Sequence, residues 1–189
     1  MSNISLSPHF SLSEFTKSAT ARSHGIKNEP APEQVENLQA LCVHTLEPLR
    51  EALGLPIIIT SGYRTKQLNH LLVNHSVKSQ HMNGQAADFY VAKGPVSGSK
   101  VQVSGNHLEL ETGASSMKHE TSSHRELLIK AFRTIILDEN IDFDQLIIYP
   151  NFIHVSYVRS GRTNRRKLTR GFSNGTYAAL SQAQALTLE

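Results

Sequence analysis

Apolar side chains recur at steps of three and four along residues 32–53, and this spacing predicts one amphipathic helix. Pro32 suits the first turn of that helix, and Gly54 suits its C-terminal end. Pro48 lacks a backbone N–H, so we expect it to kink the helix or break it locally. The apolar positions of the stripe are Val35, Leu38, Cys42, Leu46, Leu49 and Leu53.

Shorter segments along the rest of the chain predict further strands and helices. The β-branched run PIIIT is typical of a buried strand. Thr65 is suited to cap a short helix, and Ser123 and Glu126 have the spacing of a capping box. In chain order, the predicted elements are a strand at 56–60, a helix at 65–74, a strand at 85–90, a helix over 124–139, and strands at 144–150 and 151–158.

The order of these elements predicts an α+β fold, in which helices flank a small, largely antiparallel sheet. The 189 residues fit a single domain, so we expect residues 1–189 to form one unit. A stretch at about 91–122 is rich in Gly, Ser and Lys and is interpreted as an insertion. Within it, residues 100–111 alternate on both sides of Ser-Gly-Asn, which predicts a β-hairpin. Residues from about 175 onward are weakly patterned.

Composition excludes several classes of protein. The chain has no run of roughly 20 apolar residues, so no membrane span is expected. Its N-terminus lacks a basic segment followed by an apolar run, which predicts synthesis in the cytoplasm without a signal peptide. Any target outside the cytoplasm would then be reached by lysis, injection or a dedicated export route. The single cysteine, Cys42, excludes an internal disulfide and lies on the apolar stripe, which favours a buried position.

The net charge of +3 is mild, but basic residues are concentrated near the C-terminus. From Arg159 to Arg170 there are six basic residues and no acidic ones. This stretch could meet an anionic polymer such as nucleic acid or a cell-wall glycan. It could equally be a solvated loop and an edge strand that carries protective charge. No aromatic platform accompanies the arginines, so a nucleic-acid partner is not expected.

Candidate chemistry is concentrated in residues 79–88, SQHMNGQAAD. Catalytic zinc usually takes three protein ligands, and His81 and Asp88 could supply two of them. Gly84 would let the backbone turn tightly, so that the loop histidine and the strand aspartate converge. His154 is the candidate third ligand, because it alternates with apolar neighbours and would project from the opposite face of its strand.

Two other histidines offer a rival ligand pair. His70 and His75 stand five apart near the end of a predicted helix. A separation of five does not place two side chains on one helix face, which disfavours this pair.

The motifs SGYRT (61–65), LN (68–69), SQHMNGQAAD (79–88) and FIHVSY (152–157) occur in this order. The chain resembles the M15 family of zinc peptidases in these four motifs and in its segments 10–26 and 143–147. That family includes D-Ala-D-Ala carboxypeptidases and phage endolysin peptidases. The resemblance covers most of residues 9–170 apart from the 91–122 stretch, and it implies a zinc-site fold like that of the DD-peptidases and Hedgehog proteins.

The resemblance also implies roles for individual residues. His81, Asp88 and His154 would bind Zn²⁺, the expected cofactor. Arg64 would hold a substrate carboxylate or polarise the scissile carbonyl. Ser79 would hydrogen-bond the substrate or orient the loop. The substrate would be a peptidoglycan peptide, cut by a metallopeptidase of bacterial or phage origin. The oligomeric state is left open.

One part of the family pattern is missing. Family members carry a carboxylate shortly before the last histidine as general base, but no acid lies between Asp144 and His154 here. Where the related branch has an acid after QLI, this chain has Ile148 and Tyr149. The remaining acids are Asp142 and Asp144, and Glu109 and Glu111 in the predicted hairpin. The sequence therefore predicts a zinc peptidase, with a catalytically impaired cell-wall-binding or phage structural domain as the alternative.

Overall fold

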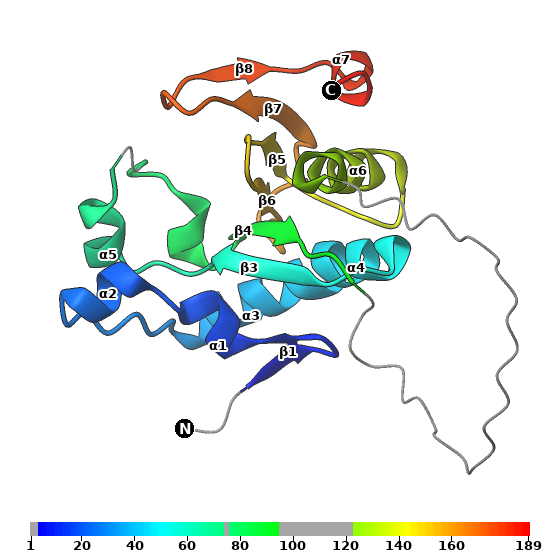
Figure 1. Cartoon of the computed structure of the whole chain (residues 1–189). Helices are drawn as coiled ribbons and strands as arrows, with labels where there is room; N and C mark the ends of the chain where they lie inside the picture. The colour runs from blue at the N-terminus through cyan, green and yellow to red at the C-terminus, as the bar shows by residue number, and fades with distance from the viewer. Residues whose placement is uncertain (1–3, 74–75, 95–122) are drawn as a thin grey trace, which may run out of the picture.

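The computed structural model describes residues 4–73, 76–94 and 123–189. Its centre is a six-stranded mixed sheet accompanied by helices, so the predicted α+β fold is confirmed (Figure 1). The predicted hairpin at 100–111 lies outside the described residues, so its prediction stays open. Among the described helices, none combines the length and apolar composition needed to cross a bilayer.

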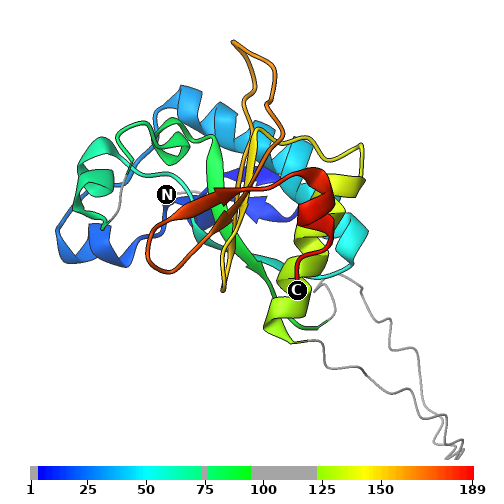
Figure 2. The same ribbon diagram turned by 90° about the horizontal axis from the view of Figure 1, so that it is seen from above.

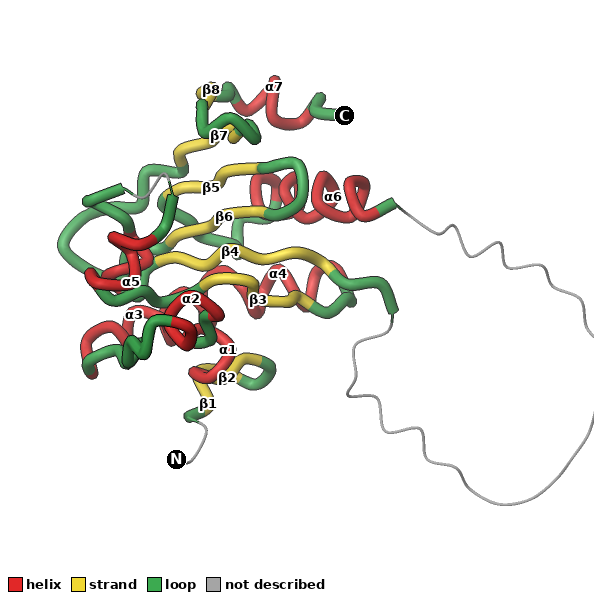
Figure 3. The backbone as a smooth tube through the Cα atoms, turned by 60° about the vertical axis from the view of Figure 1, so that its left-hand side comes forward, coloured by secondary structure: helices red, strands yellow, loops and turns green. Residues whose placement is uncertain are grey.

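The strands run side by side across the molecule (Figure 3). All neighbours pair antiparallel except β5 and β7, which are parallel. A largely antiparallel sheet was therefore the right prediction. In spatial order the strands are β3 (Ile57–Ser61), β4 (Ala86–Val91), β6 (Ile153–Ser156), β5 (Gln145–Ile148), β7 (Lys167–Gly171) and β8 (Tyr177–Ala179).

The main core lies where α4 (Glu47–Leu53) and α6 (His124–Leu137) pack on one side of the sheet. Figure 2 shows these helices on one side, with α5 (Lys66–Leu71) on the other. The Ser123–Glu126 capping box and the Thr65 cap are present as predicted. Burial raises the pKa of the Cys42 thiol, which fits its predicted role as a small buried hydrophobe.

The predicted helix over 32–53 is divided into three parts. It comprises α3 (Pro32–Leu41), a π-helical turn η1 (Cys42–Leu46) and α4. In the π turn, the Glu47 N–H donates to the carbonyl of Cys42. Pro48 cannot donate to the carbonyl of His44, which instead accepts from the Asp142 N–H at 3.1 Å. The irregularity expected at Pro48 therefore takes the form of a π-helical turn just before it, and the freed carbonyl of His44 binds the segment that precedes β5.

Several elements were not predicted. The N-terminal segment forms β1 (Ser5–Ser7), β2 (Phe10–Ser11), α1 (Leu12–Thr16) and α2 (Ala19–Ser23). The weakly patterned tail contains β8 and α7 (Gln182–Leu186). The prediction that 56–60 is a buried strand was wrong in part. The run forms the edge strand β3, so Ile57 is buried whereas Ile58 is 38% exposed.

Candidate metal centre

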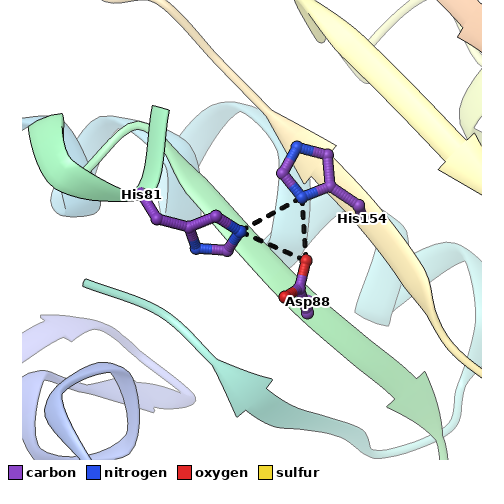
Figure 4. A group of neighbouring side chains, drawn as sticks. All are labelled: His81, Asp88 and His154. Carbon is purple, nitrogen blue, oxygen red and sulfur yellow. Dashed lines mark hydrogen bonds and ion pairs between the residues drawn. The ribbon is translucent and has the colours of Figure 1, made fainter. Parts of the chain in front are cut away.

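Three predicted ligands meet on one face of the sheet (Figure 4). Asp88 on β4 and His154 on β6 are direct cross-strand partners. His81 reaches them from η2 (Gln80–Asn83). His81 Nε2 lies 3.2 Å from His154 Nδ1 and 3.3 Å from Asp88 Oδ1, and His154 Nδ1 lies 2.8 Å from Asp88 Oδ1.

A tight turn brings His81 over the sheet. Gly84 ends η2 in a left-handed conformation at φ 67°, which favours glycine. It also lies against the start of α3, because an added Cβ would stand 2.3 Å from the carbonyl oxygen of Gln34. Asn37 of α3 donates to the carbonyl of Asn83 at 2.9 Å. The turn expected from Gly84 is therefore present, and α3 fixes its position.

Neighbouring groups set the direction of each candidate ligand atom. His81 Nδ1 lies 2.7 Å from the Gly62 carbonyl, which can only accept, so Nδ1 carries the proton and Nε2 presents its lone pair. Arg64 donates to Asp88 Oδ2 at 3.0 Å, which leaves Oδ1 facing the two histidines. Arg64 is itself held by the Ser61 hydroxyl.

The protonation of the group suits a cation. Burial lowers the pKa of His81, although Asp88 opposes this effect, so the ring is favoured in its neutral, ligating form. Burial alone would raise the pKa of Asp88, but the interactions of its carboxylate with the two imidazoles of His81 and His154 outweigh that effect. They hold the pKa of that carboxyl well below its usual range. Asp88 is therefore an anion beside two imidazoles.

The spacing fits a small tetrahedral cation. Ligand atoms about 2.0–2.1 Å from a tetrahedral zinc are about 3.3 Å apart, and two of the three observed separations are within 0.2 Å of that value. Two nitrogens and one carboxylate oxygen also form the donor set typical of catalytic zinc. The structure thus contains a candidate metal site at His81, Asp88 and His154.

A cavity of about 1070 Å³ opens over this group. Its walls come from the segment between α5 and η2, from η2 itself, and from strands β4 to β8. Arg64 and Ser79 both line it. No described residue hydrogen-bonds the Ser79 hydroxyl, so that hydroxyl is available to a ligand. His75 lies outside the described residues, so the structure does not test the rival pair His70 and His75.

The described cavity wall supplies no carboxylate that could replace the general base missing from the sequence. Among the described residues, Asp88 is the only acid that lines it. Asp144 is fully buried and accepts hydrogen bonds from Arg162, Arg165 and Gln80, so it braces the strand and is not free to act as a base. Burial raises the pKa of Tyr149, which keeps its phenol protonated and unable to accept a proton.

The network around Asp144 also reaches the metal centre, which sequence reasoning missed. Gln80, next to His81, donates to Asp144 Oδ2 at 3.0 Å and accepts from the Ser156 hydroxyl at 2.9 Å. Two arginines of the basic stretch neutralise Asp144, and their pairing lowers its pKa although burial opposes this. The absence of acids between Arg159 and Arg170 was the available signal, since these cations needed a partner elsewhere.

The fold and this group define a metallohydrolase-like domain with a His-Asp-His site in a cleft. A family model described as peptidase M15 matches residues 8–124, which is more than half of the chain. The chain therefore belongs to the peptidase M15 family, and this membership implies a metallopeptidase. The matched region contains His81 and Asp88 and ends before His154. No curated protein matches the chain.

Proposed function

We propose that the protein is a zinc-dependent peptidase that hydrolyses peptide bonds in bacterial peptidoglycan stem peptides. The observation that carries this proposal is the convergence of His81, Asp88 and His154 in the wall of an open cleft. Family membership supports peptide hydrolysis, and the donor set supports zinc. The proposed place of action is the cell wall, as a bacterial or phage product.

In this proposal, His81, Asp88 and His154 hold the zinc ion. Zinc supplies Lewis acidity toward a peptide carbonyl and lowers the pKa of water. Arg64 keeps Asp88 Oδ1 directed at the histidines, and its remaining N–H groups can hold a substrate carboxylate. Ser79 Oγ and the protonated phenol of Tyr149 can donate hydrogen bonds to substrate oxygens lying in the cleft.

Two measurements test the proposal. His154→Ala should weaken zinc binding at least about 100-fold, whereas replacement of the exposed His24 by Ala should leave it unchanged. Purified peptidoglycan incubated with the zinc-loaded protein should release peptides detectable by mass spectrometry. A protein that binds no zinc and keeps its stability in EDTA would contradict the metal site itself.

A second function is favoured by one observation, the absence of a second acid in the described cavity wall. The protein would then be a zinc-containing domain that binds cell-wall peptide or serves as a structural part of a phage particle. Zinc binding with no cleavage between pH 6 and 9 would support this alternative and exclude the peptidase.

A further inference from the structure

A row of paired residues on neighbouring strands leads from the candidate metal centre to a second, polar part of the cleft. Asp88 on β4 pairs with His154 on β6, His154 pairs with Ile147 on β5, and Ile147 pairs with Thr169 on β7. These residues therefore form one row across the sheet, and all four line the same cavity. Neighbouring strands lie about 4.8 Å apart, so Thr169 is about 10 Å from His154 along this row.

Thr169 has an unused hydrogen-bonding group in the cavity wall. Its residue is 4% exposed, and its hydroxyl has no hydrogen-bond partner among the described residues. Buried hydroxyls are normally paired, so an unpaired one in a residue of the cavity wall points to a ligand.

Three basic residues line the same cavity as Thr169. Lys167 lies two residues before Thr169 on β7, so both side chains point to the same face. Lys167 has no ion pair among the described residues. Arg162 and Arg165 also line the cavity, and the two share the single carboxylate of Asp144, which leaves one positive charge uncompensated.

We propose that Lys167 and Thr169, backed by Arg162 and Arg165, form a subsite that binds a carboxylate of the peptide substrate. This proposal rests on the proposed function and adds a preference for acidic peptides. An extended chain advances about 3.3–3.6 Å per residue, so a distance of about 10 Å is covered by about three residues. The bound carboxylate would therefore belong to a residue two or three positions from the bond placed at the metal centre.

The rest of the basic stretch favours a small carboxylate over a polyanion. Arg159 pairs with Glu36, and Arg166 donates to the carbonyls of Ile136 and Ile141. These cations have partners outside the cleft, so they add little to an extended phosphate-binding surface. Arg170 has no ion pair among the described residues either, but it does not line the cleft, so within residues 159–170 Lys167 is the cation that combines the two features. A peptide at the metal centre would meet Lys167 in the cleft wall.

The test uses two synthetic pentapeptides, L-Ala-D-Glu-L-Lys-D-Ala-D-Ala and the same peptide with D-Gln in place of D-Glu. Their affinities for the zinc-loaded full chain are measured by calorimetry. We expect the acidic peptide to bind about five- to tenfold more tightly than the neutral one. Lys167→Ala and Thr169→Val should each reduce this ratio, with Lys167→Ala bringing it close to one.

Controls separate this proposal from the proposed function. Replacement of the exposed Lys17, which lies outside the cavity, by Ala should leave the ratio unchanged, and thermal unfolding should show that every variant is folded. Equal binding of both peptides by the wild type overturns the subsite, even if both are cleaved. A preference that depends on Lys167 supports the subsite, even if neither peptide is cleaved. Binding of inorganic phosphate or DNA that depends on Lys167, without a preference for the acidic peptide, also overturns it.

Discussion

Replacement of Asp144 by Asn would test how strongly one buried carboxylate holds the candidate site together. Asp144 is fully buried and accepts hydrogen bonds from Arg162, Arg165 and Gln80. Asn keeps the shape of the side chain but removes its charge. Its NH₂ group would face the N–H donors of Arg162, Arg165 and Gln80, and two donors cannot form a hydrogen bond. The substitution leaves two guanidinium groups beside a neutral side chain.

The expected loss can be estimated from the contacts. Removing one partner of a fully buried ion pair typically costs about 3–5 kcal/mol. The Arg162 and Arg165 side chains are 41% and 50% exposed, so water can solvate the charges left behind, and we expect a smaller loss of about 2–3 kcal/mol. For a chain of this size, each kcal/mol corresponds to roughly 2–4 °C in Tm, so Tm should fall by about 4–12 °C. Because Gln80 precedes His81, we also expect weaker zinc binding.

Urea unfolding followed by far-UV circular dichroism, with and without zinc, measures both effects. Asp142→Asn is the matched control, because that side chain is 47% exposed and should lose less than about 1 kcal/mol. A stability of Asp144→Asn within 1 kcal/mol of the wild type would refute the bracing role. If such a stable variant also lost hydrolysis, Asp144 would have to be a reacting group.

Three further substitutions test other parts of the structure. Gly84→Ala should lower stability by at least about 1–2 kcal/mol in urea unfolding, because Gly84 has φ 67° and lies against the backbone of α3; an unchanged midpoint would contradict this close approach. Glu47 has a pKa lowered by hydrogen bonds from His9, although burial opposes this, so its contribution is present above about pH 4.3 and is lost as the pH falls further. Unfolding free energies between pH 7 and 3 should therefore depend less on pH in Glu47→Gln, and identical slopes would count against the pairing. Tyr149→Glu adds a carboxylate to the cavity wall and should raise kcat/KM on stem peptides at least about tenfold over Tyr149→Gln; equal rates would argue that another group takes the proton.

The ligand group could be predicted because its geometry is local. His81, Gly84 and Asp88 lie within eight residues, and one left-handed glycine sets their turn. His154 required only strand alternation to choose its face, and pairing with Asp88 completed the group. Short motifs with a fixed backbone conformation therefore carried enough information to predict this convergence.

Long-range pairing explains what the sequence did not reveal. Arg162 and Arg165 resembled a solvated charge run, yet they neutralise a carboxylate that precedes them by 18 and 21 residues. The apolar run at β3 suggested burial on both faces, but nothing in the sequence showed that it lies at the edge of the sheet. Strands β1, β2 and β8 have two or three residues each, too few for a periodic pattern.

The direct pairing of Asp88 with His154 has a consequence for chain connectivity. The two residues are 66 positions apart, and the sheet itself closes the loop between them. The entropy lost on closing a flexible loop grows only with the logarithm of its length, so doubling a loop costs only about 0.6 kcal/mol. The number of residues between Asp88 and His154 can therefore change during evolution at small thermodynamic cost, while the two candidate metal-binding side chains stay in register.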